Sequence, residues 1–201
     1  MERPTSERIQ LSTDSPIWRR FFTVAPLVVV GTREPSGEHD LAPKHMATPI
    51  GWENRFGFVC RPSHATQRNA ERTGQFTISF PRPDAFLQAG LAASGRADDD
   101  SKPALAALPV REAEAVDGVV LEDAYLWLEC ELDRIVPGFE PATLIVGRIV
   151  AASADERYLR TADGDDADVI RQAPLLAYLS PGRFAEIRES RSFPLPADFS
   201  V

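Results

Sequence analysis

The sequence predicts a mainly β fold, an antiparallel β-barrel with a few short helices. Three observations predict it: short runs of β-branched and aromatic residues between turns, one pair of long alternating segments, and 17 prolines among 201 residues. The usual share of proline is about 5%, and prolines interrupt helices, so a helical bundle is disfavoured. The alternative is a ferredoxin-like α+β fold, which needs longer crossover helices than this sequence offers.

Six segments have the composition or alternation of strands. They are Phe21–Gly31, Phe56–Cys60, Phe76–Phe80, Tyr125–Val136, Thr143–Ala152 and Leu175–Leu179. The fourth and fifth are joined by a six-residue loop that contains Pro137, Gly138 and Pro141, and we expect an antiparallel hairpin there. In the fourth segment, alternation places Leu128 and Cys130 on one face and Trp127, Glu129 and Glu131 on the other.

The other segments indicate short helices and loops. A serine start and a glycine stop predict a helix over Ser63–Thr73, and we expect another over Pro83–Ala93 and a helical turn at Ala104–Leu108. Residues 40–48 are an irregular strand or a loop, because Pro43 cannot occupy a central strand. Residues 98–102 form a predicted solvated break, and residues 162–168 a predicted acidic loop.

Composition limits the partners and the compartment. The net charge is −8 and the lysines and arginines form no cluster, so nucleic acid and anionic membranes are disfavoured. A small anionic ligand is still allowed, because local donors can override the global sign. Cys60 and Cys130 are the two cysteines, which suits a reducing, cytoplasmic location. Residues 1–20 lack the apolar run of a signal peptide, and the run near Phe21–Val30 is too short to span a bilayer.

The stretch between residues 56 and 74 is the most informative for function. A short strand enters a turn, and a polar helix follows. The first N–H groups of a helix lack intrahelical partners and carry about half a positive charge, so a phosphate binds readily there. The same stretch holds further donors and charges: Arg61, Ser63, Thr66, Arg68 and Asn69. The alternative is a surface helix for which Ser63 is only the N-cap.

Other chemistries have little support. His39 and His45 do not have the spacing of zinc ligands, and the run from Asp163 to Asp168 lacks the glycine and glutamate of a calcium loop, so we expect no metal. No nucleophile elbow, Walker loop or dinucleotide fingerprint occurs. Cys60 ends a buried strand, where a small core hydrophobe is the ordinary interpretation.

Seven motifs follow one another along the chain. They are Pro26-Leu-Val-Val-Val-Gly-Thr, His39-Asp-Leu-Ala-Pro-Lys-His, Phe56-Gly-Phe-Val-Cys, His64-Ala-Thr-Gln-Arg-Asn-Ala-Glu-Arg-Thr-Gly, Leu128-Glu-Cys-Glu-Leu, Thr143-Leu-Ile-Val-Gly-Arg-Ile-Val and Leu175-Leu-Ala-Tyr-Leu-Ser-Pro-Gly-Arg-Phe. In this order, from about residue 20 to 187, they resemble the flavin reductase-like family of FMN-binding split barrels. The likeness implies a domain over 21–187, an N-terminal extension over 1–20 and a C-terminal tail over 188–201.

The resemblance implies a Greek-key split barrel that dimerises and binds FMN near the subunit interface. By position, Thr66 and Asn69 match the threonine and asparagine that lie at the FMN phosphate in the family. The residues beside or around them are implied to line or flank the flavin: Pro43, Lys44, His45, Thr48, Cys60, Arg61 and Ser63. For the dimer surface we expect an exposed face that bears Tyr125 and Trp127.

The chain departs from the family pattern in four places. Asp40 stands where asparagine is usual, His45 where serine is usual, and His64-Ala65 where Lys-Asp is usual. In the later hairpin loop, members that are active with nicotinamide often have Gly-Asp-His, whereas this chain has Gly138-Phe139-Glu140.

The resemblance implies an NAD(P)H-dependent flavin reductase or an FMN-dependent oxidoreductase. The flavin would carry the chemistry, and the protein would supply orientation and electrostatics. Two alternatives stay open: an FMN-binding protein without reductase activity, such as a partner subunit or sensor, and a flavoprotein oxygenase that acts on a small molecule. The altered hairpin loop favours the first of these alternatives.

Overall fold

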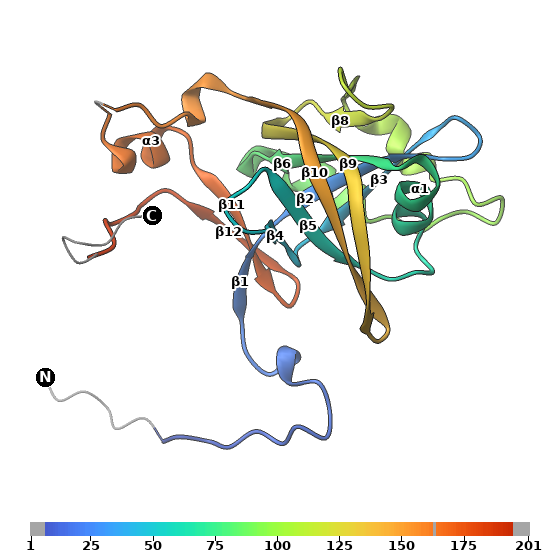
Figure 1. Ribbon diagram of the computed structural model, residues 1–201. Helices are drawn as coiled ribbons and strands as arrows, with labels where there is room; N and C mark the ends of the chain where they lie inside the picture. Colours follow the sequence, from blue (N-terminus) through green and yellow to red (C-terminus); the bar gives the residue numbers. More distant parts are fainter. Residues whose placement is uncertain (1–6, 163, 195–201) are drawn as a thin grey trace, which may run out of the picture.

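The computed structural model describes residues 7–162 and 164–194. Its centre is a seven-stranded antiparallel sheet with the order β3-β2-β6-β9-β10-β5-β4, and Figure 1 shows it curled around its own core. The strands are β2 (Val28–Arg33), β3 (His39–Lys44), β4 (Ala47–Pro49), β5 (Arg55–Cys60), β6 (Gln75–Pro81), β9 (Ala124–Phe139) and β10 (Ala142–Ala154). The predicted mainly β fold is therefore confirmed.

The sheet closes into a barrel that is split at one place. Its edge strands β3 and β4 lie at opposite ends of the strand order, yet His45 and Met46 alone join them in the chain. The two edges must therefore come together at this link without pairing. Pro43 is accommodated because β3 is an edge strand, where a missing N–H leaves no ladder bond unmade. Residues 40–48 are thus strand on both sides of the split.

Two small sheets flank the barrel. One consists of β1 (Thr23–Pro26), β11 (Leu175–Ser180) and β12 (Arg183–Ile187), and the other of β7 (Val110–Glu112) and β8 (Val119–Leu121). The prediction of one strand over Phe21–Gly31 is wrong, because β1 and β2 belong to different sheets. Pro26 ends β1 because it has no N–H with which to extend the ladder. Strand β12, which the sequence did not predict, pairs with β11.

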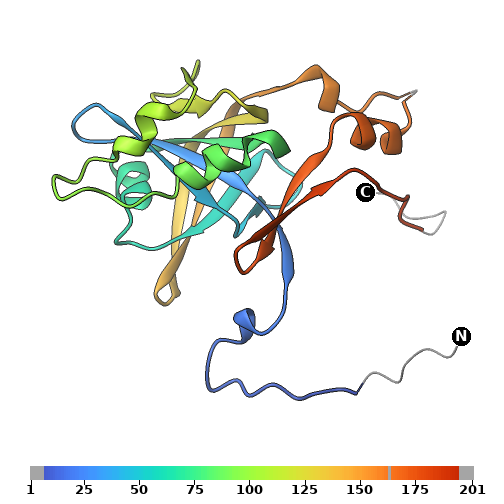
Figure 2. The same ribbon diagram turned by 180° about the vertical axis from the view of Figure 1, so that it is seen from behind.

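Strand β2 is buried on both faces, which explains its continuous run of valines. Val28 and Val30 belong to the core inside the barrel, together with Phe56, Phe58 and Phe76. Val29 faces the other way, into a second cluster that packs under α2 and the β7–β8 ribbon. Its members are Leu41, Ala89, Ala92, Leu105, Leu108, Val119 and Leu121. Figure 2 shows these elements covering that face of the barrel.

The helices are α1 (Ala65–Thr73), α2 (Phe86–Leu91) and α3 (Asp166–Gln172), with short 3-10 helices that include Pro83–Ala85 and Pro103–Ala107. The first two helices and the turn near residue 104 confirm the predictions. The prediction of an acidic loop over residues 162–168 is wrong, because α3 begins inside this range. The Asp165 carboxylate accepts a hydrogen bond from the N–H of Ala167 at 2.8 Å. This aspartate of the predicted loop is therefore the N-cap residue of α3. None of the helices in the described ranges is long and apolar enough to cross a bilayer.

The predicted hairpin is confirmed, but its six-residue loop is not. The strands continue through Pro137 to Phe139, and only Glu140 and Pro141 remain between them. Gly138 has a φ of 103°, a conformation that is unfavourable for other residues, and it takes the strand into the tight turn. Glu129, which alternation places on the face of Trp127 and Glu131, is buried, and its carboxylate accepts hydrogen bonds from the N–H groups of residues 114–116.

The predicted exposed face around Tyr125 and Trp127 is wrong for the single chain, because both side chains are half-buried against their own chain. The Trp127 indole N–H donates to the Leu121 carbonyl at 2.7 Å, and the Arg111 guanidinium lies 4.9 Å from the ring centroid. Tyr125 stacks on Tyr158 with a centroid distance of 4.5 Å, and burial raises the pKa of Tyr125 to about 12.

The close packing inside the barrel predicts the effect of one added methyl group. A Cβ at Gly147 on β10 would lie 2.7 Å from Phe76 Cε1 and 3.0 Å from Cys130 Cβ. Because overpacking a filled core costs about 1–3 kcal/mol, we expect Gly147→Ala to lower the free energy of unfolding by that amount in urea denaturation. In the matched control Gly90→Ala, the new Cβ meets no atom within 4 Å, and stability should hold. Equal losses would contradict the packing argument.

Candidate functional site

Helix α1 lies against the barrel through a buried polar face. Thr66, Gln67 and Asn69 are buried with two alanines. The Asn69 amide donates to Thr32 Oγ1 on β2 at 3.2 Å, and the Thr143 hydroxyl on β10 donates to Gln67 Oε1 at 2.5 Å. Buried polar groups need such partners, since an unpaired one costs about 1–3 kcal/mol. The alternative of a surface helix, which the sequence left open, is therefore wrong.

The first turn of α1 is open to a ligand. His64 is the N-cap residue and its side chain makes no capping hydrogen bond, so the prediction that Ser63 caps the helix is also wrong. Ser63 lies one residue earlier and is exposed. The helix ends at Gly74, whose φ of 70° is the left-handed conformation typical of a helix stop. The N–H groups of His64 and Gln67 donate to the carbonyls of Arg61 and His64. Among the described residues the first turn thus keeps the N–H groups of Ala65 and Thr66, with the hydroxyls of Ser63 and Thr66, for an external acceptor.

A cavity of about 470 Å³ opens at this turn, between α1, β3 and the segment after α2. Its charged lining consists of four cations (Lys44, Arg68, Arg96, Lys102) and two carboxylates (Asp40, Asp100). The cavity is therefore locally cationic on a chain whose net charge is −8. The helix N-terminus adds a partial positive charge of the same sign. An anion is the ligand that this combination favours.

Two histidines near the cavity have lowered pKa values, first because of burial and second because of nearby cations. Burial lowers the pKa of His64, and the charges of Lys44, Arg61 and Arg68 lower it further. Burial and then Lys44 lower the pKa of His45. Both imidazoles are therefore neutral at pH 7, because each pKa falls below its ordinary value of 6.5. The fixed cations of the cavity are lysine and arginine.

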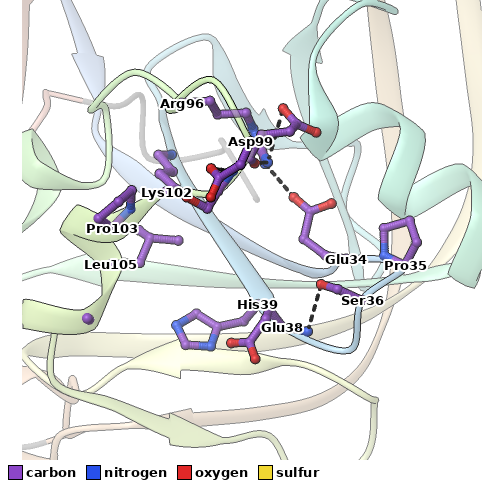
Figure 3. Close-up of a pocket in the computed structure, with 13 residues that line it drawn as sticks. Glu34, Pro35, Ser36, Glu38, His39, Arg96, Asp99, Lys102, Pro103 and Leu105 are labelled. Carbon is purple, nitrogen blue, oxygen red and sulfur yellow. Dashed lines mark hydrogen bonds and ion pairs between the residues drawn. The ribbon is translucent and has the colours of Figure 1, made fainter.

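A buried ion network forms the far wall of the cavity. Lys102 Nζ donates to the carbonyls of Leu41 and Ala92, both at 2.6 Å, and lies 3.4 Å from Asp40 Oδ1. Arg96 pairs with Asp40 at 3.2 Å and with Glu34 (Figure 3). The prediction of a solvated break at residues 98–102 is thus wrong for Lys102, whose three N–H donors tie β3 to the end of α2.

A second, more apolar cavity of about 290 Å³ lies at the split of the barrel. Pro43 and Ala93 line both cavities, so the two adjoin. Two aromatic pairs contribute to the lining. His45 and Tyr178 have ring centroids 4.6 Å apart, and the stacked pair Phe86 and Phe184 has centroids 4.5 Å apart.

The structure brings together about half of the nine predicted flavin residues. The cationic cavity is lined by Pro43, Lys44, Ser63 and Thr66, and the split cavity by Pro43 and His45. The other four line neither cavity: Thr48, Cys60, Arg61 and Asn69. Thr48 is exposed on β4, Cys60 is in the barrel core, and Asn69 bonds to Thr32 beneath the helix.

A third cavity, of about 660 Å³, lies on the other side of the ion network (Figure 3). It shares Arg96 and Lys102 with the cationic cavity but adds more carboxylates, among them Glu34, Glu38 and Asp99. An anion is therefore less favoured here. Within the described part of the chain, no group of three or more histidine, cysteine or acidic side chains is placed to hold a metal ion.

Sequence reasoning missed Arg96 and Lys102 as lining residues. Lys102 lies 62 residues from Asp40, its ionic partner. The available signal was an aspartate at position 40 where the family has asparagine, because a buried carboxylate requires a cation. The sequence does not indicate which cation supplies it.

Solved structures of other proteins share this fold, among them these three. A flavoredoxin from Methanosarcina acetivorans is 18% identical, covers 96% of this chain and 97% of its own, and has a TM-score of 0.75. Nitrilotriacetate monooxygenase component B from Bacillus cereus is 17% identical, with 94% and 100% coverage and a TM-score of 0.79. An FMN-binding protein from Thermus thermophilus with bound p-hydroxybenzaldehyde is 21% identical, with 94% and 99% coverage and a TM-score of 0.72.

At these identities the likeness establishes the fold alone. The sequence itself carries the family: residues 19–180 match the family model described as the flavin reductase like domain. This span contains the split, helix α1 and every residue of the cationic cavity. The resemblance that the seven motifs indicated is confirmed, and the chain belongs to the flavin reductase-like domain family.

Proposed function

We propose that this chain binds FMN and uses it to pass electrons from NAD(P)H to an acceptor. Family membership supports a flavin-related oxidoreductase. The observation that carries the finer proposal is the cationic cavity at the first turn of α1, which is built for a compact anion on an otherwise acidic chain. The phosphate of FMN is such an anion, and the Thermus thermophilus protein with the same fold is an FMN-binding protein.

The residues present fit the phosphate end of FMN. Lys44 and Arg68 supply charge, the hydroxyls of Ser63 and Thr66 supply donors, and the helix N-terminus supplies N–H groups. Lys102 contributes differently, because its donors are already used on two carbonyls and Asp40. Lys102 therefore forms part of the cavity wall, and the other cations would contact the phosphate.

The fit extends to the ring end. The two cavities meet at Pro43, so a flavin whose phosphate is held at α1 would reach along β3 toward the split. When bound, FMN would accept and donate the electrons of the reaction. The protein's own part is to hold and orient it: Pro43 and Lys44 line its path, and His45 packs on Tyr178 beside it. A neutral His45 would act there as a hydrogen-bonding group, with Lys44 as the fixed charge.

One observation favours a second candidate function, an FMN-binding protein without reductase activity. The hairpin turn has Gly138-Phe139-Glu140 in place of the Gly-Asp-His that nicotinamide-active members often have, and these residues line none of the three cavities. A nicotinamide site at this turn would have to be built from different groups.

We also propose a homodimer, with a second copy covering the N-terminal arm and β1. Figure 1 shows residues 7–22 extending away from the barrel. Trp18 and Phe22 on this arm and Val24 on β1 are 60%, 63% and 70% exposed, and large apolar side chains left exposed in this way are typical of an interaction surface. Light scattering should return about twice the 22.1 kDa of one chain. A single-chain mass at micromolar concentration would contradict the dimer.

The phosphate assignment predicts a selective loss in Thr66→Val, which removes the hydroxyl and keeps the shape. A hydrogen bond to a charged group contributes about 1.5–3 kcal/mol, so the Kd for FMN should rise about 10- to 150-fold. Riboflavin, which lacks the phosphate, should bind wild type and variant alike. Thr73→Val at the other end of α1 is the control and should retain FMN affinity. Equal loss of FMN and riboflavin in Thr66→Val would remove the phosphate from this site.

Nicotinamide oxidation separates the two candidate functions. We expect the purified protein with FMN to oxidise NADH or NADPH, which is measured as the loss of the absorbance of the reduced nicotinamide. The activity should disappear when FMN is removed. FMN binding that is measured separately, without oxidation of either nicotinamide, would reject the reductase and leave the FMN-binding protein.

A further inference from the structure

We infer that the cavity at the split of the barrel is a binding site for a small planar aromatic carboxylate. The inference rests on the proposed function for one point only, that the adjoining cationic cavity holds FMN. Because Pro43 and Ala93 line both cavities, a ligand in the split cavity would lie next to the flavin.

The lining is suited to an aromatic ring. His45 and Tyr178 are tilted by 33° to one another, and Phe86 and Phe184 are stacked within 21°. These rings come from the β3–β4 link, from α2 and from the β11–β12 hairpin, so folding brings together three parts of the chain that are distant in sequence. Aromatic side chains attract a further ring through offset or edge-to-face contacts.

The position of Tyr178 is set before any ligand binds. The main-chain N–H of Gly182, in the β11–β12 turn, donates to the Tyr178 hydroxyl at 2.8 Å. The hydroxyl thus accepts a hydrogen bond at the turn, and the ring lines the cavity beside His45. On α2, Ala89 and Gly90 line the cavity with small surfaces, and a Cβ at Gly90 would meet no atom within 4 Å. A flat ligand can therefore approach the helix closely.

The volume limits the ligand to a small molecule. Pockets for drug-sized ligands are about 300–1,000 Å³, and this cavity has about 290 Å³. One ring with one or two short substituents is the size that fits. A nucleotide does not.

A single arginine in the lining indicates that the substituent on the ligand's ring is negatively charged. Among the described residues that line the cavity, Arg183 is the one with a permanent charge. Within residues 7–162 and 164–194 its guanidinium makes no ion pair or side-chain hydrogen bond, although many other arginines of the chain do. A guanidinium binds a carboxylate through two parallel hydrogen bonds, which makes an aromatic carboxylate the complementary ligand.

The test uses benzoate as the probe and isothermal titration of the full-length protein, with and without FMN. Benzamide keeps the ring and removes the charge, and cyclohexanecarboxylate keeps the charge and removes the planar ring. We expect benzoate to bind at least about fivefold more tightly than either, since a partly exposed charge pair and an aromatic contact each contribute about 1 kcal/mol.

Two variants test the assigned groups. Arg183→Gln should raise the Kd for benzoate about fivefold and leave that for benzamide unchanged, whereas Phe184→Leu should weaken both. Arg171→Gln, on exposed α3, makes the same change of charge outside the cavities and should have no effect.

The outcomes distinguish this inference from the proposed function. Failure of benzoate to bind a protein that binds FMN overturns the inference and leaves the proposed function intact. Displacement of FMN by benzoate also overturns it, because the split cavity would then be the seat of the flavin ring. Equal binding of benzoate and benzamide, or an unaffected Arg183→Gln, overturns the carboxylate assignment. If FMN does not bind at all, the proposed function fails, and benzoate titration of the flavin-free protein still decides the presence of the site.

Discussion

The hydrogen bonds beneath helix α1 are the constraint on which the site depends. Asn69 bonds to Thr32 on β2, and Gln67 accepts from Thr143 on β10, two strands that are not neighbours in the sheet. The Thr143 hydroxyl also lies 3.3 Å from the Cys60 carbonyl at the end of β5, where the chain leaves the barrel toward the helix. A shift or rotation of α1 would leave several of these buried groups unpaired, at about 1–3 kcal/mol each. The direction of the first turn, and with it one wall of the cationic cavity, is therefore fixed by the barrel.

The charged residues around the cavity have two different roles. Asp40 is buried and compensates Lys102 and Arg96, which in turn fix the segment after α2 against β3. Lys44 and Arg68 do not pair with Asp40, and their positive charges give the cavity its attraction for anions. The family's usual asparagine at position 40 would leave Lys102 without its carboxylate. The aspartate is thus explained by the two cations that face it, and the excess of acidic residues elsewhere does not cancel the local field.

Local patterns predicted much of the fold. The alternation of Phe76–Phe80, the long hairpin, and the Gly74 stop after α1 each depend on neighbours in sequence, and the structure confirms them. The exceptions are positions where a distant partner decides the outcome. Glu129 alternates like a solvent-facing residue but is buried because a loop 13–15 residues earlier gives it three N–H donors.

At the site, too, local patterns found some residues and partners distant in sequence decided the others. Thr66 and Lys44 were found because each lies in a motif that the family resemblance covers, and they line one cavity. Asn69, taken from the same motif, bonds to Thr32 instead, which no local pattern could show. Arg96 and Lys102 come from a segment that has the composition of a solvated loop. Their burial depends on Asp40, and a pairing across 62 residues has no signature in a single sequence.

The central claim is that the barrel presents the first turn of α1 as a phosphate site. A crystal structure of the protein with FMN tests it most directly. We expect the phosphate at the N-terminus of α1, within hydrogen-bonding distance of the Thr66 hydroxyl and close to Lys44, with Asn69 still bonded to Thr32. A phosphate bound in the acidic cavity beside Glu34, or a flavin held with its phosphate in solvent away from α1, would contradict the account.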